Sequence, residues 1–207
     1  MTDLLAQVGE LPIEWLMAAL GLVMLADAVP LVGVLVPGDA AVLAAVGAGR
    51  PTTGAATVAA VVTGCLAGWS LSFLAGRRWG ASLRGSRLGG WIGESRWAAA
   101  EAVLRRGGGR MVLVAPFLPV LNALLPLAAG GLRMSYPKFL AAAALGATLW
   151  AGLYVALGTA ARAVSALLPG APSPALVTML VGLLLAGALL FGARRPLRAL
   201  TGVGPAA

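Results

Sequence analysis

The stretch that decides the fold runs from residue 111 to residue 131 and reads MVLVAPFLPVLNALLPLAAGG. It is long and apolar enough for a membrane-spanning helix, which needs about 20 residues. However, Pro116, Pro119 and Pro126 each remove a backbone donor and clash with the preceding turn, so one straight helix is not expected. Broken backbone at membrane depth is tolerated only where protein or a water-filled cavity surrounds it. The stretch therefore predicts a re-entrant hairpin of two half-helices.

The composition of the whole chain excludes a soluble domain. Of its 207 residues, 60% are hydrophobic and 11% are charged, whereas soluble domains average about 45–50% apolar and about 25% charged residues. There is no histidine, and the one cysteine, Cys65, lies in an apolar run. We interpret Cys65 as a packing residue, because no histidine is available to activate it. Neither a metal site nor a cofactor is expected.

Five further apolar stretches accompany residues 111–131. Four of them have the length of a spanning helix: Leu11–Val29, Gly54–Gly76, Phe139–Gly158 and Ala175–Ala193. The fifth, Pro30–Gly49, is interrupted by Pro37, Gly38 and Asp39, which predicts a second re-entrant hairpin. The expected fold is an all-α polytopic membrane protein, a single membrane domain over residues 1–207 with about four transmembrane helices and two re-entrant hairpins.

The basic residues predict the orientation in the membrane. Segment 77–110 carries eight arginines against two glutamates, and the tail 194–207 carries three more arginines. Short basic loops stay cytoplasmic, and both segments can be cytoplasmic only if residues 111–131 turn back instead of crossing. Working backwards, Leu11–Val29 is expected to cross outward from a cytoplasmic N-terminus. Both termini would then be cytoplasmic in a multi-pass protein of a bacterial cell membrane.

Segment 77–110 is also expected to lie on the inner leaflet. Three tryptophans stand among its arginines, a composition typical of interfacial segments: Trp79, Trp91 and Trp97. Arginines beside the apolar stretches are candidates for contact with lipid headgroups: Arg77, Arg78, Arg110 and Arg133. Membrane lipids are the expected partners, and the sequence leaves open whether the protein forms a homo-oligomer. Binding of nucleic acid by this segment is the disfavoured alternative.

The two broken regions resemble each other. The first region and the span after it contain Pro37, Gly47, Trp69 and Gly76, which are 10, 22 and 7 residues apart. The second region and its span contain Pro119, Gly130, Trp150 and Gly158, which are 11, 20 and 8 residues apart. The predicted topology makes the two units enter from opposite sides, as in the inverted repeats of secondary transporters. Glycine-rich apolar sequence also produces such matches by chance, so the spacing alone does not decide whether the two units are a true repeat.

Two of the seven acidic residues lie in apolar surroundings. Asp27 stands near the end of the first span, and Asp39 directly follows Pro37 and Gly38. Ionisable groups in such segments are costly and usually face a cavity or a partner. A turn between them could bring both into one polar pocket, which makes the pair a candidate for loading and releasing protons. Two simpler readings remain: Asp39 caps a half-helix, and Asp27 reaches the outer interface.

The polar residue of the second broken region is Asn122. Its simpler role is to satisfy a backbone group that proline has freed. Alternatively, it faces a central cavity in which the N-termini of half-helices could bind an anion such as a lipid phosphate. The candidates for lining a substrate cavity are Pro37, Gly38, Pro119, Asn122 and Pro126.

At these motifs, between residues 22 and 158, the sequence resembles the DedA family of membrane proteins, whose domain is also called VTT or SNARE-associated. The family shows an acid, a Pro-Gly-Asp/Glu stretch that leads into a small-residue helix ending in Gly, and a Gly-Arg-x-x-Gly after the next span. Here these are Asp27, Val36–Asp39, Ala45–Gly47 and Gly76–Gly80. The second hallmark of the family is R-F-x-P-x-x-R, followed by P-x-x-A-G, a Met, an aromatic residue and a Trp. In this sequence it corresponds to Pro116–Asn122, Pro126–Gly130, Met134, Phe139 and Trp150.

The resemblance implies transport of a lipid. Members of the family move lipids across membranes, including undecaprenyl-phosphate and phospholipids, some with coupling to the proton gradient. Asp27 and Asp39 match the proton-linked positions, whereas Pro116 and Asn122 stand where the family has two anion-binding arginines. We expect a transporter of a lipid or lipid-linked amphiphile and not an enzyme, with a less charged substrate as plausible as a carrier-lipid phosphate. The alternative is a non-transporting membrane scaffold or envelope-homeostasis protein.

Overall fold

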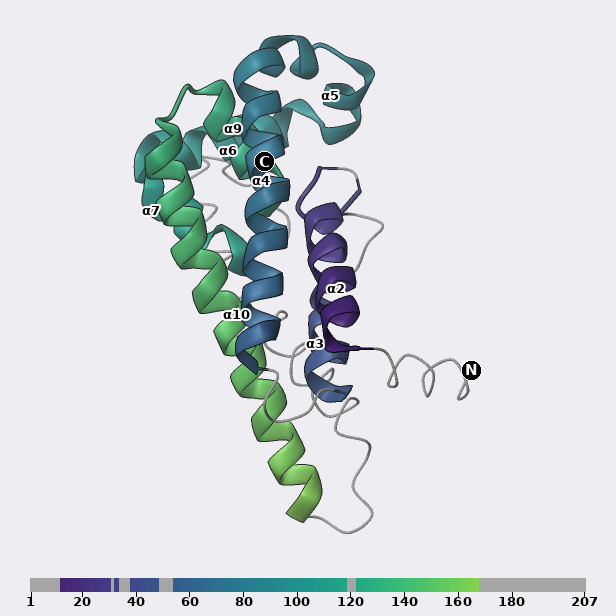
Figure 1. Cartoon of the computed structure of the whole chain (residues 1–207). Coiled ribbons are helices and arrows are strands. Elements are labelled where there is room, and N and C mark those ends of the chain that lie inside the picture. Colours follow the sequence, from purple (N-terminus) through teal and green to yellow (C-terminus); the bar gives the residue numbers. More distant parts are fainter. Residues whose placement is uncertain (1–11, 31, 34–37, 49–53, 119–121, 168–207) are drawn as a thin grey trace, which may run out of the picture.

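The computed structural model describes residues 12–30, 32–33, 38–48, 54–118 and 122–167 (Figure 1). All regular secondary structure in these residues is helical. In chain order the helices are α2 (Ile13–Asp27), α3 (Gly38–Ala48), α4 (Gly54–Arg84), α5 (Arg87–Ile92), α6 (Glu94–Gly107), α7 (Gly109–Val114), the 3-10 turn η2 (Ala115–Phe117), α9 (Leu124–Gly131) and α10 (Tyr136–Leu167).

Helices α4 and α10 form the long axis of the molecule. Each is about 46–48 Å long at a rise of 1.5 Å per residue, and among the described helices these two are long and apolar enough to cross a membrane. They run in opposite directions, because Phe73 stacks on Phe139 at 4.6 Å while Gly54 lies beside Val155. The predicted helices Gly54–Gly76 and Phe139–Gly158 are therefore confirmed as helices. The predicted span Ala175–Ala193 lies outside the described residues.

Helix α2 packs along α4 in the same direction. A Cβ atom on Gly64 would lie 2.2 Å from the carbonyl oxygen of Gly21, and one on Gly68 would lie 2.7 Å from the Cβ of Ala28. Further along, the Ser72 hydroxyl donates to the carbonyl of Ala28 at 3.3 Å. Small residues permit this close approach of the two backbones, as is common where helices pack in membranes.

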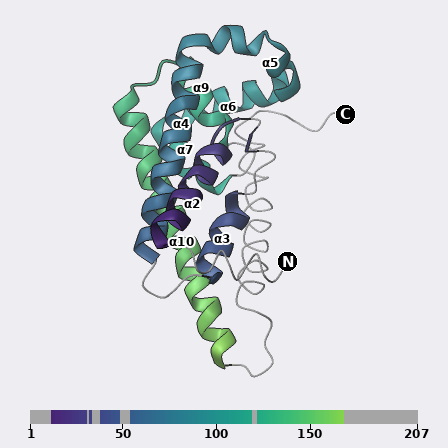
Figure 2. The same cartoon turned by 45° about the vertical axis from the view of Figure 1, so that its right-hand side comes forward.

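The direction of α2 differs from the sequence-based prediction. Leu11–Val29 was expected to cross the membrane against the direction of Gly54–Gly76, yet α2 is parallel to α4. Its 15 residues span about 22 Å, less than the roughly 30 Å of a hydrocarbon core, and Pro30 opposes its continuation. Helix α3 then leads back towards the end of the bundle where α4 begins (Figures 1 and 2). Thus α2 and α3 are the two arms of one hairpin, the first hairpin of the chain, whereas the sequence predicted a spanning helix at Leu11–Val29 and a separate hairpin within Pro30–Gly49. The N-terminus itself lies outside the described residues.

The decisive stretch 111–131 is broken and not a single rod. The helix gives way to the turn η2 at Ala115–Phe117 and resumes at Leu124. Its first arm, α7, runs parallel to α10, because Gly109 lies beside Ala142 and the Leu113 carbonyl beside Gly146. Its second arm, α9, lies on the C-terminal half of α4, with the Cβ position of Gly130 against the carbonyl of Phe73. The predicted break is confirmed, and α7, η2 and α9 form the second hairpin of the chain.

The packing of the four arms follows one pattern. In each half of the chain the first arm packs on the long helix that follows it, α2 on α4 and α7 on α10. The second arm instead packs mainly on the long helix of the other half, α3 on α10 and α9 on α4. The two halves are therefore interlocked through the packing of α3 on α10 and of α9 on α4.

Helices α5 and α6 fold over the end of the bundle at which α4 finishes and α10 begins (Figure 1). The Arg84 guanidinium at the end of α4 pairs with Glu94 and, at 3.1 Å, with Glu101. Its hydrogen bond holds the pKa of the Glu94 carboxyl below its ordinary value, so this ion pair stays charged at neutral pH. Trp97 was predicted to be interfacial but is only 3% exposed, because it lies on the buried face of α6, the helix that packs on α9.

Candidate functional site

Two acidic side chains meet where the first hairpin turns. Asp27 ends α2, and its Oδ1 atom accepts a hydrogen bond from the backbone N–H of Gly38 at 3.2 Å, at the start of α3. A Cβ atom on Gly38 would lie 2.5 Å from the Asp27 carboxyl carbon, so only glycine permits this approach. Asp39 follows directly and lies within electrostatic range of Asp27. The structure thus brings together the two acids that the sequence singled out.

Two aromatic side chains connect Asp39 to α10. The Tyr154 hydroxyl lies close to the Asp39 carboxylate on one side and to the indole of Trp150 on the other. The rings of Trp150 and Tyr154 are 4.3 Å apart, and both side chains are buried. Residues four apart on a helix share a face, which is why these two can act together on one carboxylate. The acidic turn of the first hairpin is therefore held by the long helix of the second half.

The depth of these acids follows from the packing of α2 on α4. Leu25 and Ala28, which stand on either side of Asp27, pack against Gly68, three residues after Cys65. Cys65 is the central residue of the charge-free stretch Gly54–Gly76, with eleven residues on either side, which corresponds to about 16 Å of helix in each direction. The two carboxylates accordingly lie near the middle of the long apolar helix.

The second hairpin brings an amide to the core. Asn122 donates its backbone N–H to the carbonyl of Leu118 at 2.9 Å, and the Oδ1 atom of its side chain is buried without a hydrogen-bond partner in the described part of the chain. Pro126 is buried within α9. The other two prolines predicted to line a cavity, Pro37 and Pro119, lie outside the described residues.

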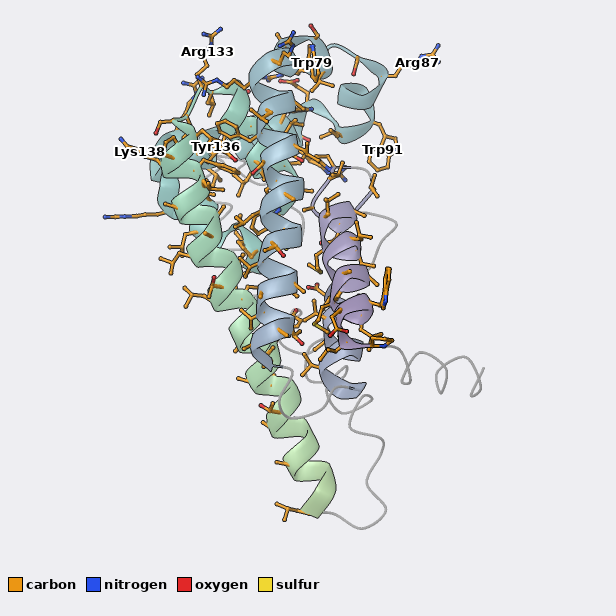
Figure 3. The ribbon with its side chains drawn as sticks, viewed as in Figure 1. Trp79, Arg87, Trp91, Arg133, Tyr136 and Lys138 are labelled. Carbon is orange, nitrogen blue, oxygen red and sulfur yellow. The ribbon has the colours of Figure 1, made fainter. Side chains whose placement is uncertain are left out.

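Exposed basic residues gather at the end of the bundle covered by α5 and α6 (Figure 3). The four arginines proposed for headgroup contact are all exposed: Arg77, Arg78, Arg110 and Arg133. The Arg78 guanidinium lies 5.7 Å from the ring centre of Trp79, and the exposed rings of Trp79 and Trp91 project from this end. The described residues contain no group of three metal-ligating side chains.

The comparison with known proteins identifies the family of this arrangement. The family model of the VTT domain matches residues 11–160, which covers both hairpins and most of both long helices. The chain belongs to the VTT domain family, the DedA family of membrane proteins. Its sequence-based resemblance to that family is thereby confirmed.

Several mycobacterial proteins are similar to this VTT chain. One uncharacterised membrane protein of Mycobacterium tuberculosis and one of Mycobacterium bovis are each 38% identical over 101 residues, 47% of this chain and 46% of the relative. One of Mycobacterium leprae is 40% identical over 73 residues, 35% of this chain and 34% of the relative. The matches thus span less than half the length of these relatives. No solved structure matches the chain.

Sequence reasoning missed Tyr154 as a site residue of this VTT protein. Tyr154 is one of only two tyrosines in the chain, and it stands four residues after Trp150 on a predicted spanning helix. A buried hydroxyl on such a helix requires a hydrogen-bond partner, which was the available signal. Its partner could not be found from the sequence, because Asp39 and Tyr154 are 115 residues apart and meet only through the packing of α3 on α10.

Proposed function

We propose that this VTT-family chain is a proton-coupled transporter that moves a lipid or lipid-linked amphiphile across the cell membrane. The observation that carries the proposal is the pair Asp27 and Asp39, which meet near the middle of the apolar helix α4 at the turn of a broken segment. Ionisable side chains at such depth are costly and mark ion pathways and proton relays. In this proposal the two acids bind and release the coupling proton.

The proposed inverted repeat supports an alternating-access mechanism. The first unit comprises α2, α3 and α4, and the second comprises α7 with η2, α9 and α10. Each unit has a broken hairpin followed by a long helix, and the two long helices are antiparallel. Rocking of one repeat against the other, around a site at mid-depth, is the common mode of transporters built in this way.

The proposed membrane boundaries follow the exposed tryptophans. Trp15, which is 69% exposed, lies on α2 near the start of α4, because Met17 contacts Thr57. Trp79, which is 53% exposed, lies 22 residues after Thr57 on α4, or about 33 Å further along the helix. Tryptophans favour the two membrane–water interfaces, and this separation suits a core of about 30 Å.

The basic end covered by α5 and α6 would face the cytoplasm, because short loops rich in arginine stay on that side. There the four exposed arginines would contact anionic lipid headgroups. The proposed partners are therefore membrane lipids and not nucleic acid, and no enzymatic step is proposed. The rival function, a non-transporting scaffold, would use the same basic end but would leave the acids without a role in movement.

Reconstitution into liposomes tests the function directly. Purified protein is inserted into vesicles that carry one fluorescent lipid each from a panel of phospholipids, a polyprenyl phosphate and uncharged amphiphiles, and the accessibility of the lipid to a membrane-impermeant quencher is followed. We expect at least one lipid to move faster than in protein-free vesicles, at a rate that changes with an imposed pH gradient. Protein-free rates for every lipid, from correctly folded protein, would contradict transport and favour the scaffold.

A further inference from the structure

An apolar cavity of about 290 Å³ lies where α5 and α6 fold over α4 and α9. Its described lining includes Pro30, Leu71, Ala75, Ile92, Trp97 and Leu127. Ser72 also lines it, but the Ser72 hydroxyl is already paired, because it lies 3.3 Å from the carbonyl oxygen of Ala28 and 3.0 Å from that of Gly68. A cavity with such an apolar lining is a poor site for water.

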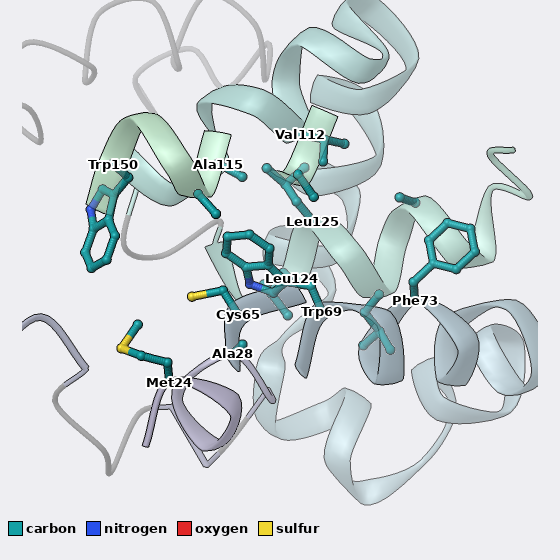
Figure 4. Packing of buried hydrophobic residues seen from close by; sticks show 14 of the residues in the cluster. Met24, Ala28, Cys65, Trp69, Phe73, Val112, Ala115, Leu124, Leu125 and Trp150 are labelled. Atoms are coloured by element: carbon teal, nitrogen blue, oxygen red, sulfur yellow. The ribbon is translucent and has the colours of Figure 1, made fainter. Parts of the chain in front are cut away.

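The cavity borders a filled core. The middle of the bundle is occupied by a cluster of buried apolar side chains, among them Trp69, Phe73 and Leu125 (Figure 4). From this cluster the cavity extends to Leu71, whose side chain is exposed. Native interiors leave few voids larger than a water molecule. A cavity of this size beside a packed core therefore suits a bound apolar group that enters from outside.

The cavity lies at the level of one membrane leaflet. Trp79, which marks the proposed membrane boundary at the basic end, follows Leu71 by eight residues and Ala75 by four on α4, or about 12 and 6 Å. Trp91, which directly precedes Ile92, is exposed and projects from α5 (Figure 3), as expected at a membrane–water interface. The cavity thus lies between the hydrocarbon layer and the headgroups of the leaflet at the basic end.

Arg96 places a positive charge beside the cavity. Its guanidinium donates to the carbonyl oxygen of Ile92 at 3.2 Å. Both Ile92 and Trp97, the residue that follows Arg96, line the cavity. The two glutamates of segment 77–110 pair with Arg84 instead. Since a guanidinium has five N–H donors, Arg96 keeps donors and its charge for an anion such as a lipid phosphate.

We propose that this cavity binds one acyl chain of an anionic phospholipid, whose phosphate is bound by Arg96. The volume is at the lower end of the range of small-molecule sites, about 300–1,000 Å³, which suits a single chain and not a whole lipid. The headgroup stays at the membrane surface, so its charge is not buried in the apolar layer. The described lining includes neither Asp27 nor Asp39. The inference therefore goes beyond the proposed transport: this lipid is held by the protein and not moved.

Native mass spectrometry of the full-length protein in detergent tests the inference, because it counts the lipids that remain bound. The probes are dioleoyl phosphatidylglycerol, dioleoyl phosphatidylcholine as the lipid with the same chains and no net charge, and glycerol phosphate as the headgroup without chains. We expect one phosphatidylglycerol to bind about tenfold more tightly than phosphatidylcholine, as for one charge-assisted hydrogen bond, and glycerol phosphate not to bind. Equal affinity for the two lipids, or binding of glycerol phosphate as tight as that of phosphatidylglycerol, would overturn the inference.

Two variants separate the chain from the headgroup. Ala75→Leu adds apolar atoms to the lining of the cavity, so it should weaken the binding of both lipids about tenfold. Arg96→Gln removes the charge and keeps a long polar side chain. It should lower the affinity for phosphatidylglycerol to that for phosphatidylcholine and leave the affinity for phosphatidylcholine unchanged.

Each variant has a matched control on the same helix. Ala81→Leu makes the same addition at an exposed position of α4, and Arg105→Gln removes the charge of an exposed arginine of α6. Both controls should bind the lipids as the wild type does, and thermal unfolding should show that all four variants fold. The inference is overturned if the controls weaken binding as much as Ala75→Leu and Arg96→Gln do, or if Arg96→Gln weakens both lipids equally. Transport is measured separately, by lipid movement in liposomes.

Discussion

Replacing Asp39 with asparagine is expected to lower the rate of lipid movement about tenfold or more and to remove its response to a pH gradient. Asparagine keeps the shape of aspartate and an oxygen that can accept a hydrogen bond, but it cannot take up or release a proton. A single tenfold loss corresponds to about 1.4 kcal/mol in the barrier, which is modest for a group that acts in the coupled step. The measurement is the quencher assay in liposomes, with and without a pH gradient.

Glu14→Gln is the matched control for Asp39→Asn. Glu14 also carries a carboxylate in the first hairpin, but it is exposed at the far end of α2. Its replacement should leave the rate and its dependence on the gradient unchanged. Wild-type transport by folded Asp39→Asn protein would remove the proposed role of the acidic turn, whereas equal losses in both variants would point to a general effect of charge.

Replacing Gly130 with alanine is expected to cause the largest loss of stability among single methyl additions in the described helices. The new Cβ would lie 1.9 Å from the carbonyl oxygen of Phe73 on α4, and this backbone atom cannot move away as a flexible side chain could. Overpacking in a tight core costs roughly 1–3 kcal/mol. The thermal unfolding midpoint of purified protein in detergent measures the effect.

Gly152→Ala provides the comparison for Gly130→Ala. Gly152 lies within α10, and a Cβ atom there would meet nothing within 4 Å. Alanine has the higher helix propensity, so this variant should be as stable as the wild type or slightly more stable. Equal unfolding midpoints for the two variants would contradict the close contact between α9 and α4 on which the position of the second hairpin depends.

The sequence predicted the parts of the fold that depend on apolar length and on proline. The two long helices contain the stretches Gly54–Gly76 and Phe139–Gly158, which have neither proline nor charge, and the break in 111–131 falls among its three prolines. The direction of Leu11–Val29 was not predictable, because 19 apolar residues can either cross a membrane or return as one arm of a hairpin. The contacts of Gly64, Gly68 and Ser72 with α2 decide this, because they follow one another in the same order along both helices.

The candidate site was predictable to a similar extent. The rarity of acids in apolar surroundings singled out Asp27 and Asp39, and a turn between them was enough to expect their approach. Tyr154 was missed because its contact with Asp39 depends on how α3 packs across to the other half of the chain. Trp97 was misjudged, because tryptophan among arginines is as compatible with a core position beneath an amphipathic helix as with an interface.

The central claim is that the second hairpin enters and leaves the membrane on one side. In a Cys65→Ala background, single cysteines at Arg110 and Arg133 mark its two ends, and both positions are exposed. A membrane-impermeant maleimide is applied to sealed, inside-out and right-side-out vesicles. The account predicts that both cysteines react in the inside-out vesicles only. If one cysteine reacts in each orientation, the segment crosses the membrane, and the account is contradicted.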